Sequence, residues 1–130
     1  MFAKRIHHVS FAVRDLDASR AFYESVLGLE PAERPDIGLP GAWYAAGNAQ
    51  IHLIAAPEGF DLGAAPDRLT PLANHCAFAI ESYDESLAFL KDRGAEVFET
   101  KPEIGQLWVR DPDGNVIELI DPHGRGAGNA

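Results

Sequence analysis

The stretch HVSFAV at residues 8–13 returns later in the chain as HCAFAI at residues 75–80. Downstream, DASRAF at 17–22 matches DESLAF at 84–89, and GLE at 28–30 matches GAE at 94–96 after the loss of one residue. Further out, QIHLI at 50–54 matches VIELI at 116–120. Self-similarity at a fixed spacing indicates a repeated structural unit, so the sequence predicts two modules of about 65 residues.

Each module is expected to form a strand, a helix and three further strands. Alternating apolar residues predict the strands, and an apolar stripe at helical spacing predicts the helices. Asp15 or Asp17 is a candidate N-cap, and Gly28 and Gly94 are placed to end the two helices. DPDG at 111–114 is typical of a turn between paired strands. The expected strands are 6–13, 30–34, 42–46 and 49–55, then 74–80, 95–99, 106–110 and 115–120, with helices at 15–27 and 83–93.

These elements predict an α+β fold in one domain, residues 1–122. Module 1 covers about residues 5–56 and module 2 about 74–122, by the extent of the repeat. Residues 57–73 between them are rich in Pro and Gly and are expected to be a linker. Residues 123–130 are expected to be a flexible tail.

Composition narrows the classes of protein. The chain has 130 residues and a net charge of −9, without a run of basic residues, which excludes a typical nucleic-acid binder. No apolar stretch is long enough to span a membrane, and the N-terminus does not resemble a signal peptide. Cys76 is a single cysteine, which suits a reducing compartment. We therefore expect a cytoplasmic protein.

Polar side chains occur at equivalent places on apolar strands. By alternation, His8 and His75 lie on the face opposite the helix-covered one, and His52 and Glu118 are each flanked by Ile and Leu. Burying such groups costs free energy unless they are paired. A lone histidine is usually structural, but the repetition favours a divalent-metal site with three imidazoles and one carboxylate. His7 is assigned by alternation to the helix side as an edge or packing residue, and His123 to the solvated tail.

Over residues 5–122 the chain resembles the vicinal oxygen chelate superfamily, which includes glyoxalase I, fosfomycin and bleomycin resistance proteins, methylmalonyl-CoA epimerase and extradiol dioxygenases. The resemblance lies in HVSFAVRDL at 8–16, AFYESVLGL at 21–29 and DPDGNVIEL at 111–119. It implies paired βαβββ modules that form an open cup around one divalent metal ion (Fe, Ni, Zn, Mn or Co). It also implies a homodimer and a small-molecule substrate. The implied metal ligands are His8, His52, His75 and Glu118.

The resemblance further implies a metal-dependent lyase or isomerase of the glyoxalase type, with Glu118 and His52 as acid/base candidates. The metal would act as a Lewis acid toward two oxygens of the substrate. Glyoxalase I commonly has Glu where this chain has His52, so His52 is a ligand, an acid/base or a substrate contact. The alternatives are a single-domain Fe(II) extradiol-type dioxygenase and a non-catalytic small-molecule binding or resistance protein. Candidate substrate contacts are Arg34 for an anionic group and Trp43 or Trp108 for an apolar wall.

Overall fold

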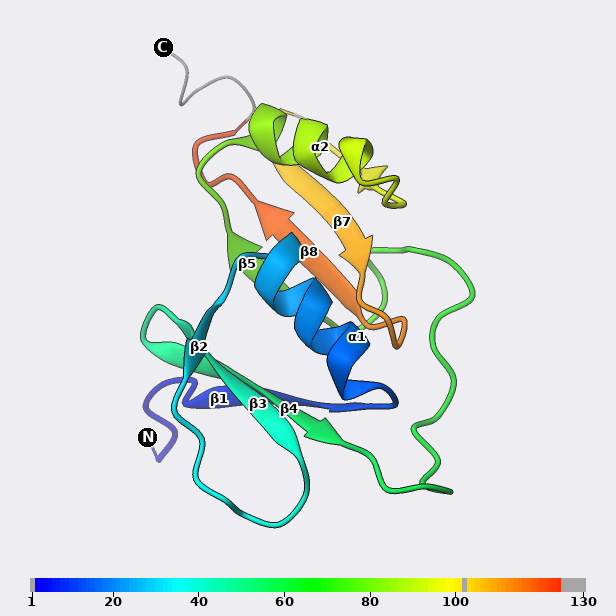
Figure 1. The fold of residues 1–130 in the computed structure, drawn as a ribbon. Helices are drawn as coiled ribbons and strands as arrows, with labels where there is room; N and C mark the ends of the chain where they lie inside the picture. The colour runs from blue at the N-terminus through cyan, green and yellow to red at the C-terminus, as the bar shows by residue number, and fades with distance from the viewer. Residues whose placement is uncertain (1, 102, 125–130) are drawn as a thin grey trace. The chain divides into compact units, whose positions relative to one another are not determined.

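The structure, a computed structural model, describes residues 2–101 and 103–124 and divides into two compact units, residues 1–64 and 65–130 (Figure 1). Each unit holds one four-stranded mixed sheet and its helix, so the predicted α+β class and the two repeated modules are confirmed. The boundary between the units falls within the predicted linker. Of the predicted tail, only residues 123 and 124 lie within the described part of the chain, and residues 125–130 lie outside it.

The sheet of the first unit has the strand order β1-β4-β3-β2. β1 runs parallel to β4, whereas β3 is antiparallel to both β4 and β2. The predictions for the third and fourth strands hold to within one residue, and the first two strands are shorter than predicted. The strands are β1 (His8–Val13), β2 (Glu30–Ala32), β3 (Gly41–Ala46) and β4 (Ala49–Ala55).

The second unit repeats this topology with the order β5-β8-β7-β6 and β5 parallel to β8. The strand predicted at 95–99 is wrong in extent, since only β6 (Phe98–Glu99) forms. The amide of Ala95 donates back to the carbonyl of Leu90 over 3.1 Å, so this residue closes the end of a helix. The other elements are β5 (His75–Ala79), α2 (Tyr83–Asp92), β7 (Gln106–Arg110) and β8 (Val116–Ile120).

The first helix differs from the prediction of one continuous α-helix. It begins as α1 (Leu16–Ala21), where Asp15 caps the N-terminus by accepting from the amide of Ala18 over 3.1 Å. It continues as a π-helical turn, η1 (Phe22–Val26), before Gly28 at φ +72°. The first module has one residue more than the second between the matched DASRAF and GLE segments. A π-helical turn accommodates one extra residue, so η1 absorbs this difference between the modules.

None of the helices in the described ranges is both long enough and apolar enough to cross a membrane.

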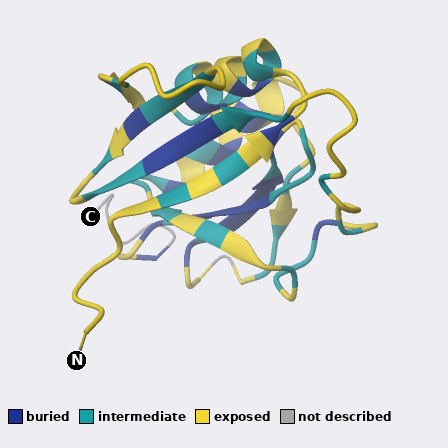
Figure 2. Ribbon diagram, turned by 90° about the horizontal axis from the view of Figure 1, so that it is seen from below, coloured by how far each residue is buried: buried dark blue, intermediate teal, exposed yellow. Residues whose placement is uncertain are grey.

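The predicted two-faced character of the first strands is confirmed. Along β1, the residues from His8 to Ala12 alternate between exposed and half-buried, and Val13 at the end is buried. The same alternation runs along β5, and Figure 2 shows half-buried and exposed positions following one another along such strands. The histidines at the start of both strands therefore stand on the less buried face.

Each module also anchors one buried tyrosine to a glutamate. The Tyr44 hydroxyl donates to Glu24 on η1 over 2.8 Å, and Glu24 in turn pairs with Arg20 over 2.9 Å. In the second unit the hydroxyl of Tyr83, at the start of α2, donates to Glu99 on β6. Burial, followed by the bond to Glu24, raises the pKa of Tyr44 well above its usual value. These bonds give the hydroxyl groups of two buried tyrosines a hydrogen-bond acceptor.

Candidate functional site

Strand register places the candidate side chains in two equivalent pairs, one in each unit. In the parallel ladder of β1 and β4, Ser10 is the register partner of His52, and in that of β5 and β8, Ala77 is the partner of Glu118. His8 and His75 each come two residues before that partner. Residues two apart on a strand share a face. Both pairs, His8 with His52 and His75 with Glu118, therefore have the same diagonal arrangement on adjacent strands.

The first pair is held in a stack of rings. The rings of His8 and His52 are nearly parallel, with their centroids 4.1 Å apart. Trp43, the register partner of His52 on β3, stacks on the opposite side of His52 at 4.1 Å. His52 is consequently buried, with 6% of its surface exposed, whereas His8 is exposed. Trp43 thus acts as a cover over His52.

The contacts of His52 define its chemical state. Its Nε2 lies 2.8 Å from the Oε1 atom of Gln50. An amide oxygen only accepts, so in this contact Nε2 carries the proton and Nδ1 keeps the lone pair. Burial is the main cause that lowers the pKa of His52, and electrostatic interactions with His8, His7 and Arg34 lower it further. A neutral imidazole whose Nδ1 keeps its lone pair can serve as a metal ligand or as a base.

In the second pair, a ring nitrogen of His75 faces a carboxylate oxygen of Glu118. His75 Nδ1 donates to the carbonyl of Ala73 over 2.7 Å, and His75 Nε2 lies 3.3 Å from Glu118 Oε1. Glu118 is buried on β8, with 7% of its surface exposed. Since the Nδ1 proton is engaged, Nε2 either carries a second proton toward Glu118 or presents a lone pair to it. Two lone-pair atoms this close repel one another unless a cation lies between them.

The geometry of this second pair fits a metal ion. Divalent zinc, for example, binds nitrogen and oxygen ligands tetrahedrally at about 2.0 to 2.2 Å, which places neighbouring donors about 3.3 to 3.6 Å apart. A histidine that donates its other N–H to a backbone carbonyl is the usual arrangement in metal sites. Within neither unit does the described part bring together three His, Cys, Asp or Glu side chains that could hold an ion. The predicted ligands therefore occur as two half-sites with two donors each.

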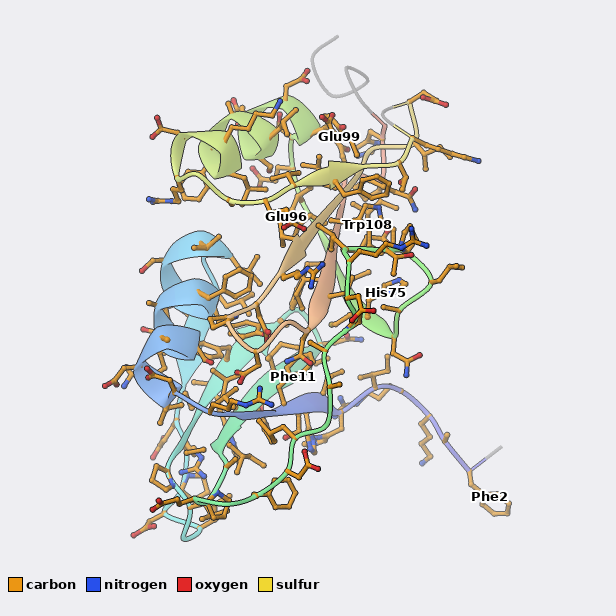
Figure 3. The ribbon with its side chains drawn as sticks, turned by 90° about the vertical axis from the view of Figure 1, so that its right-hand side faces the viewer. Phe2, Phe11, His75, Glu96, Glu99 and Trp108 are labelled. Atoms are coloured by element: carbon orange, nitrogen blue, oxygen red, sulfur yellow. The ribbon has the colours of Figure 1, made fainter. Side chains whose placement is uncertain are left out.

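The second half-site opens into a cavity of about 520 Å³ within the second unit. Trp108 is buried there and meets His75 edge-on, with the ring centroids 4.7 Å apart (Figure 3). Trp108 gives this cavity an apolar side, and Lys101 adds a cationic group to the lining; contact of Trp108 with a substrate stays a prediction. The cavity is lined by Pro71, His75, Thr100, Lys101, Ile104, Gln106, Trp108 and Glu118.

Arg34, predicted as a contact for an anionic group, is held within its own loop. Its Nη2 donates to the carbonyl of Leu39 over 2.7 Å, and its buried Nε has no hydrogen-bond partner among the described residues. The guanidinium is close enough to His52 to contribute to the lowering of the pKa of that residue. Arg34 therefore belongs electrostatically to the first half-site.

Several residues around the half-sites were not found from the sequence. Gln106 and Thr100 connect Glu118 to Trp108, and His7 contacts His8. For Gln106 a signal existed, because it is a polar residue at the start of the apolar stretch QLWV at 106–109.

The equivalence of the two tryptophans was also missed. Trp43 is the register partner of His52, and Trp108 is the register partner of Glu118. The connection between β3 and β4 is shorter than that between β7 and β8, which shifts the two tryptophans out of step in a simple alignment of the modules.

Comparison with known proteins agrees with this architecture. The chain is 35% identical over 124 residues to Glyoxylase I 4 of Arabidopsis thaliana, covering 89% of this chain and 70% of that protein. It is 33% identical to a lactoylglutathione lyase of Salmonella typhimurium over an alignment of 141 residues, which covers 96% of this chain and 99% of that protein. The crystal structure of a Bacillus anthracis protein assigned to the glyoxalase family superposes with a TM-score of 0.72 at 28% identity. The superposition covers 93% of this chain and 97% of that chain. Residues 5–119 match the sequence model of one superfamily, so the chain belongs to the Glyoxalase/Bleomycin resistance protein/Dioxygenase superfamily.

Proposed function

We propose that this protein is a divalent-metal-dependent lyase or isomerase of the glyoxalase type that acts on a small substrate with neighbouring oxygen atoms. The observation that carries the proposal is the 3.3 Å approach of His75 Nε2 to Glu118 Oε1 while His75 Nδ1 is engaged by Ala73. The relatives from Arabidopsis and Salmonella, whose names describe glyoxalase and lactoylglutathione lyase, support the reaction class.

We propose that one ion takes its ligands from both half-sites: His8, His52, His75 and Glu118. When bound, the ion supplies a Lewis acid that polarises a substrate carbonyl and stabilises negative charge on its oxygen. An imidazole binds a metal ion through the lone pair of its neutral form, and the carboxylate supplies the negative charge. Reconstitution with Fe, Ni, Zn, Mn and Co in turn identifies the metal that the protein binds.

Glu118 is the proposed general base. Its carboxylate takes a proton from the carbon next to the substrate carbonyl and returns that proton to a neighbouring atom, so the overall reaction is an isomerisation. His52, neutral and with a lone pair on Nδ1, is the second acid/base candidate. Trp108 and Ile104 add apolar side chains to the lining of the cavity beside Glu118.

The assembly and compartment belong to the same proposal: a homodimer in the cytoplasm. Light scattering on the purified chain measures the assembly, and a monomer at micromolar concentration would contradict it.

The decisive experiment is metal analysis of protein purified without a metal-affinity tag, before and after reconstitution with each of the five metals. We expect one metal ion per chain, with strong losses in His8→Ala and Glu118→Ala. His123→Ala is the matched control, since His123 is exposed in the turn after β8. Absence of stoichiometric metal under every condition overturns the proposal and favours a non-catalytic binding protein.

Activity then separates the two enzyme classes. Solvent deuterium incorporation next to the carbonyl, followed by NMR on small hydroxy- and oxo-carbonyl compounds including lactoylglutathione, reports the proposed proton transfer. Anaerobic exchange with Ni, Co, Zn or Mn supports an isomerase or lyase. Oxygen consumption with Fe and a catechol, together with absence of exchange, indicates the extradiol dioxygenase instead.

A further inference from the structure

A chain of hydrogen bonds runs from Trp108 to Glu118 within the second unit. The indole Nε1 of Trp108 donates to Thr100 Oγ1 over 3.0 Å, and Thr100 Oγ1 donates to Gln106 Oε1 over 3.0 Å. Gln106 Nε2 then reaches Glu118 Oε2 over 3.5 Å, a long hydrogen bond. All four residues line the cavity of the second half-site.

The groups at the two ends of this series of hydrogen bonds determine which atom donates and which accepts at each step. An indole N–H only donates, and an ionised carboxylate only accepts. Thr100 must therefore use its lone pair for Trp108 and its proton for Gln106. The Gln106 amide then has its oxygen toward Thr100 and its NH₂ group toward Glu118, so its orientation cannot be reversed without leaving a partner unsatisfied.

Because of these hydrogen bonds, the two carboxylate oxygens of Glu118 have different partners. Oε2 of Glu118 accepts from Gln106, and Oε1 faces His75. Both Trp108 and Glu118 are buried, with 2% and 7% of their surfaces exposed. Thr100 and Gln106 between them are half-buried. Loss of either end link would leave a buried group, the Trp108 N–H or the Glu118 carboxylate, without this partner, so the network favours one arrangement of its members.

We propose that Thr100 and Gln106 are positioning residues that orient the Glu118 carboxylate, so that Oε1 alone binds the metal ion. This inference rests on the proposed function. Thr100 and Gln106 are neutral and would act only through Glu118. Their hydrogen bonds would determine whether the carboxylate binds the ion through one oxygen or through both.

The test uses the metal-free full chain and Co²⁺ as the probe. Thr100→Val removes the hydroxyl at almost constant volume, and Thr100→Ser is the matched control that retains it. We expect Thr100→Val to weaken Co²⁺ binding about tenfold, as is typical when a partner of a metal ligand is removed. We also expect a change in the visible absorption of bound Co²⁺, since the carboxylate is free to bind through both oxygens. Thr100→Ser should restore both readouts.

NMR of the metal-free protein checks the network itself. In Thr100→Val the indole N–H resonance of Trp108 should shift, whereas that of Trp43 in the first unit should stay in place. If Thr100→Val does not fold, Gln106→Met provides the same loss of the donor to Glu118 with a side chain of similar length.

The outcomes separate this inference from the proposed function. Wild-type protein that binds Co²⁺, with unchanged affinity and spectrum in both Thr100→Val and Gln106→Met, overturns the positioning role alone. Wild-type protein that binds no metal overturns the proposed function, and the positioning role with it.

Discussion

The Nδ1 atom of His7 lies 2.9 Å from the Nδ1 atom of His8. One of the two nitrogens must donate the shared proton and the other must accept it. When His8 donates, its Nε2 keeps a lone pair, which is the form that binds a metal ion. Of the edge or packing role expected for His7, the packing role is wrong, because His7 is exposed, directly precedes β1 and contacts the candidate ligand His8.

We therefore expect His7→Ala to weaken metal binding about tenfold by releasing the His8 ring, against a far greater loss for His8→Ala. Competition titration against a chelator measures both affinities. His123→Ala serves again as the control for an exposed histidine. Wild-type affinity in His7→Ala would show that the contact between the two rings does not orient His8.

Trp43 covers His52, and burial is the main cause of the lowered pKa of His52. In Trp43→Leu this cover is reduced, so the pKa of His52 should rise toward its ordinary value. Trp43→Phe should preserve most of the effect because it keeps a stacking ring. NMR titration of the His52 ring in the metal-free protein gives the pKa directly. An unchanged value in Trp43→Leu would assign the lowering to the neighbouring charges instead.

Because the pKa of Tyr44 is raised in the folded protein, the free energy of unfolding should vary with pH in the alkaline range. A tyrosine whose pKa is higher in the folded state stabilises the fold fully below its unfolded value of about 10, and this contribution is lost as the pH rises above it. At pH 8, Tyr44→Phe should cost about 1 kcal/mol through the lost bond to Glu24. Above pH 10 the difference between the two proteins should shrink. Urea unfolding of both proteins at pH 8 and above pH 10 measures this difference. A difference that stays constant would show that Tyr44 does not link stability to pH.

Asp111 organises the turn between β7 and β8. Its side chain accepts from the amides of Asp113 and Asn115 and from the Asn115 side chain, at 2.8 to 2.9 Å. Asp111→Ala leaves these donors without their acceptor and should lower the free energy of unfolding by about 2 to 3 kcal/mol. Asp111→Asn keeps one acceptor oxygen and should lose less. Equal urea midpoints for wild type and Asp111→Ala would show that water replaces the carboxylate.

The sequence predicted those features that depend on local pattern. Period-two alternation and the repeated HVSFAV segment predicted which face His8 and His75 occupy, and the register of β1 with β4 and of β5 with β8 agrees with that prediction. Asp15 as a cap and Gly28 as a helix end follow from rules that involve only a few neighbouring residues. Binding of metal by His8, His52, His75 and Glu118 stays a prediction.

Features that depend on how side chains meet in space could not be predicted in the same way. The π-helical turn η1 needs a hydrogen bond whose partner is chosen by packing, although the one-residue difference between modules was visible. The bond from Tyr44 to Glu24 joins residues from different elements. The link from Trp108 through Thr100 and Gln106 to Glu118 joins three segments, and no periodicity in the sequence signals it.

The presence of His52 where Glu118 stands in the other module affects the charge of the proposed centre. Three neutral imidazoles and one carboxylate would leave a divalent ion with about one unit of positive charge. In a chain with a net charge of −9, that centre would be a local cationic site. It would favour a substrate that becomes a monoanion during reaction over one that stays neutral. A second carboxylate in place of His52 would abolish this preference by neutralising the centre.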